Sequence, residues 1–216
     1  MITHLPKELV AERLRVMRGI RLVIRDISLT CARGEALILT GANGVGKTTL
    51  MRAIAGFLPL AAGEIRLLGD SSEASVGERS HYVGHLNGVK RSLTVMETLR
   101  FFGRFLGEDG GGRAEGAAER LGLGGLLDVP SGYLSAGQKR RLALARLLCA
   151  ERPLWLLDEP TVSLDAASQE VLAGIVNEHL AVGGMVVAAT HIGLGWTNMT
   201  PFDLARASAL AEAEPA

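Results

Sequence analysis

The chain has 216 residues, of which 48% are hydrophobic and 21% charged, and its 23 Lys and Arg residues balance its 23 Asp and Glu residues. This length fits one substantial domain rather than two. The neutral balance excludes the bulk basic field that favours nucleic acid or anionic lipid as a main partner. No apolar run reaches the about 18 residues of a membrane span, and the N-terminal residues do not resemble a signal peptide. We therefore expect a cytosolic protein.

Apolar runs between turn residues predict short strands at both ends of the chain. In the first part they are 13–17, 21–24 and 27–30, expected to be antiparallel, then a buried strand at 36–39 and another at 65–68. Later strands are expected at 154–157 and 185–189, with a helix over 169–180 between them. Short buried strands that alternate with helices favour a mainly parallel sheet.

The middle of the chain changes to a helical period. Thr94 is a good N-cap for a helix whose apolar residues run to Leu106, and a glycine cluster over 107–112 ends it. A short helix over 114–121 follows, weakened by Gly116. We therefore expect residues 90–150, approximately, to form a helical insertion in an α/β core. Cys31 and Cys149 lie in apolar runs and are interpreted as reduced packing residues.

A phosphate-binding loop is the clearest chemical signal. The segment fits G-x-x-x-x-G-K-[ST] and lies between a predicted strand and a predicted helix; its residues are Gly41, Ala42, Asn43, Gly44, Val45, Gly46, Lys47, Thr48 and Thr49. The glycines let backbone N–H groups converge on a polyphosphate at a helix N-terminus. Lys47 brings a positive charge to the outer phosphates, and the Thr48 hydroxyl is a ligand for Mg²⁺. The alternative is an ordinary glycine-rich turn.

Two further segments are candidates for a role in the same site: residues 154–159 and the helix that begins after Ser135. The strand at 154–157 runs into Asp158 and Glu159. Beside a phosphate loop, Asp158 would hold Mg²⁺ and Glu159 would orient or deprotonate an attacking water; alone, the pair also fits a turn with a helix cap. Ser135 is a good N-cap for the helix that follows it, and Gly137 leaves the backbone open to an anion near the start of that helix. The alternative there is a capped amphipathic helix with a basic face.

These segments, in this order, resemble the ATP-binding cassette (ABC) family over nearly the whole chain. The resemblance implies an α/β fold, a P-loop NTPase ABC cassette with a RecA-like core, an antiparallel β subdomain and a helical signature subdomain. The cassette would span 12–205, with 206–216 as a tail that is either a frayed helix or disordered. The family's motifs fall on the signature residues Leu134, Ser135, Ala136, Gly137 and Gln138, on the D-loop residues Ser163, Leu164 and Asp165, and on the switch histidine His191.

The resemblance also implies a mechanism. Two copies would pair head to tail, with each ATP between the phosphate loop of one copy and the signature segment of the other. Lys47, Glu159 and His191 would serve hydrolysis, and Thr48 and Asp158 would hold Mg²⁺. Closure of the homodimer around ATP would move integral membrane subunits.

Three positions depart from the family pattern. Ala136 replaces a glycine and is tolerated if its φ is negative. His85 stands where the family has a glutamine that touches Mg²⁺. An imidazole can also bind a metal or its water, which makes His85 a candidate Mg²⁺ contact, but its charge changes near neutral pH. Arg18 stands where an aromatic ring usually stacks on adenine, and its planar guanidinium can stack as well.

Within the family, Tyr82–His85, the Leu-Ser-Ala-Gly-Gln signature and the segments 153–167 and 189–194 resemble the ATPase subunit of the cytochrome c maturation (haem exporter) system. The resemblance implies a peripheral protein on the cytoplasmic face of the bacterial inner membrane that energises haem export or haem delivery. Haem would not bind this chain, which has no Cys-x-x-Cys-His motif. The alternatives are the ATPase of a lipid, peptide or drug exporter and, with less support, a non-transport ABC ATPase of DNA repair, chromosome organisation or translation, or a nucleotide-binding regulator without turnover.

Overall fold

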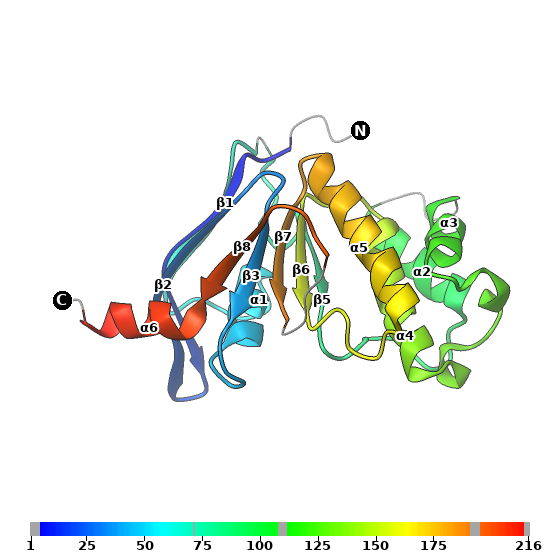
Figure 1. Ribbon diagram of the computed structural model, residues 1–216, viewed down its shortest axis with the longest axis horizontal. Helices are drawn as coiled ribbons and strands as arrows, with labels where there is room; N and C mark the ends of the chain where they lie inside the picture. The colour runs from blue at the N-terminus through cyan, green and yellow to red at the C-terminus, as the bar shows by residue number, and fades with distance from the viewer. Residues whose placement is uncertain (1–4, 71, 108–111, 191–194, 214–216) are drawn as a thin grey trace.

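Two β-sheets and a helical region make up the protein (Figure 1). The computed structural model describes residues 5–70, 72–107, 112–190 and 195–213. A three-stranded antiparallel sheet has the order β2-β1-β4, and a five-stranded parallel sheet has the order β5-β6-β7-β3-β8. The predicted α/β cassette with an antiparallel subdomain and a helical insertion is confirmed.

The antiparallel sheet consists of β1 (Glu8–Arg18), β2 (Arg21–Ala32) and β4 (Ala62–Leu68). The prediction of two strands at 21–24 and 27–30 is wrong, because β2 runs through both. Asp26 lies between them at φ 49, in an irregular part of the ladder, and accepts two hydrogen bonds of 2.7 Å from Arg15. The polar pair interrupts the apolar pattern of β2 without ending the strand.

The parallel sheet consists of β5 (Ser80–Val83), β6 (Leu154–Asp158), β7 (Met185–Ala189), β3 (Ala36–Thr40) and β8 (Met199–Asp203). Every residue of β6 and β7 is buried, which fits the continuous apolar runs that predicted them. Strand β8 was not predicted: it is mostly exposed, and Pro201 in its middle argues against a strand unless the strand lies at an edge.

Six α-helices occur in the described part of the chain, at α1 (Lys47–Ile54), α2 (Val95–Phe105), α3 (Gly112–Arg120), α4 (Ala136–Ala145), α5 (Ala166–Ala181) and α6 (Leu204–Ala213). Short 3₁₀ turns lie at Gly124–Leu126, Ser131–Tyr133 and Arg146–Leu148. Thr94 caps α2 as predicted, in a reciprocal pair with Glu97. Helix α6 covers most of the predicted tail. No helix among the described residues has the length and apolarity to cross a membrane.

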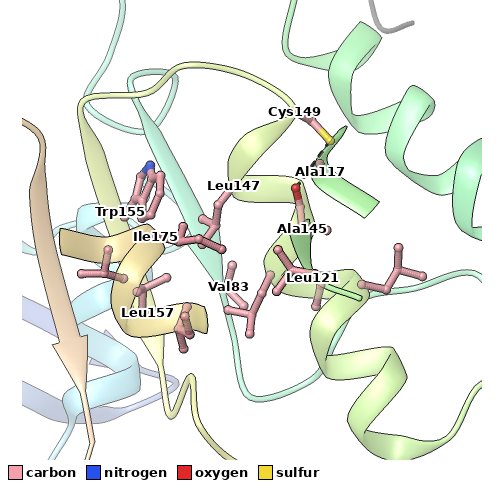
Figure 2. Close-up of a cluster of buried hydrophobic side chains, with 14 of the residues drawn as sticks. Val83, Ala117, Leu121, Ala145, Leu147, Cys149, Trp155, Leu157 and Ile175 are labelled. Atoms are coloured by element: carbon pink, nitrogen blue, oxygen red, sulfur yellow. Dashed lines mark hydrogen bonds between the residues drawn. The ribbon is translucent and has the colours of Figure 1, made fainter. Parts of the chain in front are cut away.

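Two hydrophobic cores lie on the two faces of the parallel sheet. One joins the sheet to α5 and the helical region, and Figure 2 shows Trp155 and Leu157 of β6 near Leu147 and Ile175. The other packs α1 and the antiparallel sheet against the opposite face. Cys31 and Cys149 are buried and free, one in each core, and burial raises the pKa of their thiols to about 12 and about 11. Their interpretation as packing residues is confirmed.

Two histidines, His81, which is buried, and His179, which is half-buried, make stability depend on pH. Burial lowers the pKa of His81, which contacts the Ala150 carbonyl at 2.8 Å, and of His179, which stacks on Trp155, from 6.5 to about 4. Between these values the unfolded chain binds the proton and the folded chain does not, so acid favours unfolding. Each histidine should lower the free energy of unfolding by roughly 1.4 kcal/mol per pH unit below about 6.5.

Urea denaturation at several pH values from 7.5 to 5 measures this slope, in a window where most carboxylates stay ionised. His179→Phe keeps a planar ring over Trp155 and should remove about half of the slope. An unfolding free energy that stays constant over this range would contradict the expectation.

Candidate functional site

The chemical groups that the sequence predicted meet at the carboxyl edge of the parallel sheet. Leu39 of β3 and Asp158 of β6 are both paired with Ala189 of β7, so the three strands end level with one another. The phosphate loop follows β3, and Glu159 follows β6. Ligands of parallel sheets bind at this edge, and the sheet register alone brings these two segments together.

The phosphate loop has the backbone that its glycines predicted. Gly41, Gly44 and Gly46 have φ values of 127°, 83° and 115°, in the region that disfavours side chains. A Cβ on Gly46 would also lie 2.8 Å from the Ile24 side chain. Helix α1 starts directly after Gly46 and has no side-chain cap. The N–H groups of its first turn are therefore open to an anion.

Lys47 is folded onto the loop that it belongs to. Its side chain is largely buried, at 8% exposure, and Nζ donates to the Gly41 carbonyl at 2.7 Å and to the Ala42 carbonyl at 3.2 Å. These bonds hold the ammonium group against the open end of the loop. A cation at this position is suited to polyphosphate oxygens, which are stronger acceptors than the two carbonyls.

Thr48 and Asp158 meet across the site. The Thr48 hydroxyl donates to the Asp158 carboxylate at 2.8 Å, and Asp158 is only 3% exposed. A hydroxyl beside a buried carboxylate is an oxygen donor set that fits Mg²⁺, which keeps several waters and takes few protein ligands. No group of three or more His, Cys, Asp and Glu suited to a metal occurs among the residues that the structure describes. The protein thus offers a site that phosphate oxygens and water would complete.

Glu159 lies in a strained turn directly after β6. Its φ is 48°, and its backbone N–H donates to the Ala189 carbonyl at 2.8 Å. A non-glycine residue in this region costs about 1–3 kcal/mol and needs support from its surroundings. The bond to Ala189 fixes the position of Glu159 relative to β7.

Arg140 is a residue of the site that the sequence interpretation missed. It lies on α4, is 3% exposed, and donates to carbonyls of the turn at 158–160. In the sequence it belongs to the basic run 139–141, which predicts a solvated helix face. The burial follows from how α4 packs against the end of β6, and no local sequence signal marks it.

The signature segment and the D-loop contact each other. Ser135 caps α4 and forms a reciprocal pair with Gln138, as its predicted N-cap role requires. Ala136 is the first residue of α4 and has no positive φ, so alanine fits there. A Cβ on Gly137 would lie 2.9 Å from the Ser163 carbonyl, which explains the glycine by close approach.

In the D-loop, Ser163 has a φ of 67°, and Leu164 donates its N–H to the Thr161 carbonyl at 3.1 Å. Asp165 caps α5 and accepts from the Ser168 N–H at 2.8 Å, and its hydrogen bonds to Ser168 lower its pKa. The D-loop thus begins at Ser163, whose backbone is strained, and ends at Asp165, the N-cap of α5.

His85 and Arg18, two further predicted site residues, are exposed on the surface of the protein. His85 is exposed and follows β5, whose Val83 is paired with Leu157 of β6, so the histidine emerges at the same edge of the sheet. Arg18 is exposed at the hairpin between β1 and β2, opposite Arg21, and its role toward adenine stays a prediction. His191 lies outside the described residues.

The comparisons with known proteins agree with this geometry. The sequence pattern of the ABC transporter family matches residues 24–162. The cytochrome c biogenesis ATP-binding export protein CcmA of Rhizobium meliloti (strain 1021) is 50% identical over 200 residues, which cover 91% of this chain and 97% of that protein. The protein of the same name from Mesorhizobium japonicum is 48% identical, with 87% and 93% covered.

Among solved structures, a putative ABC transporter ATP-binding protein from Pyrococcus furiosus superposes with a TM-score of 0.77 at 26% identity, covering 92% of this chain and 98% of that one. The whole cassette is therefore shared, and the cytochrome c biogenesis proteins share about half of its residues as well. The chain belongs to the ABC transporter family of ATPases, in the group formed by the CcmA proteins of cytochrome c biogenesis.

Proposed function

We propose that this chain is the ATP-hydrolysing subunit of a membrane complex that exports or delivers haem for c-type cytochromes. The complex would lie at the bacterial inner membrane, with this chain on its cytoplasmic face. The contact between Thr48 and Asp158 carries the proposal, because it joins the phosphate loop to the carboxylate strand in the arrangement that ATP hydrolysis requires. The export role is supported by the names of the two relatives, which are cytochrome c biogenesis ATP-binding export proteins.

ATP would bind with its phosphates on the loop 41–49. The open N–H groups at the start of α1 and the Lys47 ammonium would bind the phosphate oxygens. Thr48 and Asp158 would hold Mg²⁺, which when bound neutralises charge on the phosphates. Glu159 would take a proton from the attacking water, or orient it, and His191 would hold the outer phosphate.

We further propose that two copies of the chain close around ATP. Helix α1, at the phosphate loop, and α4, which begins in the signature segment, pack on opposite faces of the parallel sheet (Figure 1). One copy would therefore need the signature segment of another. The Ser135 hydroxyl accepts from the Gln138 N–H at 3.2 Å, which leaves its own proton for a phosphate oxygen of the partner's ATP.

The membrane subunits would dock beside α2. Leu86, Phe101 and Phe105 are 81%, 55% and 73% exposed. Phe105 also lines an open cleft of about 680 Å³, together with Phe57 and Tyr82. Exposed apolar side chains beside a cleft favour a protein partner. A crosslinking map of the complex without contacts from 86–105 would remove this part of the proposal.

The experiment that tests the function replaces Lys47 by Ala in the native host and follows haem-stained c-type cytochromes. Loss of the phosphate-binding cation should abolish ATP turnover and leave c-type haem undetectable, while b-type haem stays normal. Membrane assembly of the variant is checked in parallel, because an unassembled subunit would give the same loss. Normal c-type cytochromes, in a strain without a second copy of the gene, would reject the haem role and favour another export cargo.

A further inference from the structure

Arg140 occupies an unusual position for a charged side chain. Its guanidinium donates five hydrogen bonds: to the carbonyls of Gly84 (2.7 Å), Asp158 (3.0 Å), Glu159 (2.7 Å) and Pro160 (3.1 Å), and to the Asn87 side-chain oxygen (3.3 Å). All five acceptors are neutral oxygens. Burial lowers the pKa of Arg140, which the nearby carboxylates of Asp158 and Glu159 offset in part. Burying a cation among carbonyls is costly, so its retention calls for a local reason.

One end of the guanidinium holds the strained turn after β6. Three consecutive carbonyls, from Asp158 to Pro160, accept from it, and Glu159 in the middle has a φ of 48°. A strained backbone persists only where several contacts determine it. The planar fork of arginine can bind three carbonyls of one turn at once, which a lysine ammonium cannot do with the same geometry.

The other end holds the loop after β5. Nη1 of Arg140 binds Gly84, the residue before His85, and Asn87. Arg146 binds the same loop, with Nη1 3.2 Å from the Asn87 carbonyl and its guanidinium 4.3 Å above the Phe102 ring. The loop 84–87 is thus held by two arginines, one facing the turn at Glu159 and one facing α2.

We propose that Arg140 is a positioning residue for ATP hydrolysis: it holds the turn that carries Glu159 and joins this turn to the loop 84–87. A displacement of that loop is transmitted to Glu159 through the planar guanidinium of Arg140, which binds both segments. The inference rests on the proposed catalytic role of Glu159. The link between the loop 84–87 and Glu159 uses the backbone carbonyl of Gly84. It therefore does not depend on which side chain stands at position 85.

The test compares purified full-length variants for ATP affinity, with a fluorescent ATP analogue, and for steady-state kcat. Arg140→Gln should lower kcat by about 10- to 100-fold, as expected for a catalytic group displaced by up to an ångström, and leave ATP affinity within about threefold. Arg140→Lys should recover part of kcat. Arg141→Gln is the matched control: Arg141 is the next residue of α4 and binds the Leu121 and Gly122 carbonyls, away from the turn.

Two readouts separate positioning from a merely structural role. In a Glu159→Gln background, Arg140→Gln should cause little further loss of kcat, because both changes remove one function. Amide hydrogen exchange should speed up in both 84–88 and 158–159 of Arg140→Gln, with the thermal midpoint measured alongside.

A folded Arg140→Gln variant with kcat within twofold of wild type would overturn the inference. So would a loss that multiplies with that of Glu159→Gln, or faster exchange in only one of the two segments. If Arg140→Gln does not fold, Arg140→Lys decides: unchanged kcat overturns the inference and a selective fall in kcat supports it. Normal turnover of Glu159→Gln alone would instead reject the proposed role of Glu159.

Discussion

A Glu159→Gln variant should bind ATP with nearly wild-type affinity and lose about 10²- to 10⁴-fold in kcat, the usual contribution of a general base. The substitution keeps the size and shape of the side chain and removes its ability to take a proton. The backbone of the turn keeps its bonds, since the Glu159 N–H and carbonyl that hold it are unchanged. ATP affinity stays because the phosphate loop and the contact between Thr48 and Asp158 are separate from this side chain.

The variant is measured by steady-state phosphate release and by equilibrium binding of ATP. Glu178→Gln is the control: it makes the same chemical change on α5, where Glu178 forms an exposed ion pair with Arg120 of α3, and kcat should stay within about twofold. Retention of more than a tenth of wild-type kcat by Glu159→Gln would exclude it as the base and direct attention to another proton acceptor.

Gly63→Ala should destabilise the protein by roughly 2–4 kcal/mol, the range expected when a backbone position that tolerates only glycine is filled. Gly63 has a φ of 87°, and an added Cβ would lie 2.5 Å from the Arg13 carbonyl and close to that of Glu12. Both neighbours are backbone atoms of β1, at the point where its pairing with β4 shifts register. Neither can move without opening the antiparallel sheet.

Urea denaturation monitored by tryptophan fluorescence measures the change. Gly116→Ala is the matched control, because Gly116 lies inside α3 and an added Cβ there meets nothing within 4 Å. Alanine in an open helical position should stabilise the protein by roughly 0.5–1 kcal/mol. If Gly63→Ala is as stable as wild type, the close approach of β1 and β4 at this point is wrong.

The sequence alone was enough to predict the phosphate loop and the carboxylates that serve it. Gly41–Thr49 and 154–159 are contiguous motifs whose chemistry depends on local residue order, and buried strands have strong apolar patterns. Helix caps were equally readable, because Ser135 and Thr94 bond to groups only three residues away.

The tertiary structure decided what depends on residues distant in the chain. The pairing of Leu39 and Asp158 with Ala189 sets which segments share the carboxyl edge of the sheet, and strand order is a property of the whole fold. Edge strand β8 and the bulge at Asp26 escaped prediction because partners from elsewhere outweigh weak local patterns. Arg140 shows the limit most clearly: local sequence places it on a basic helix face, and only the packing of α4 against the end of β6 and the loop after β5 turns an exposed charge into a buried one.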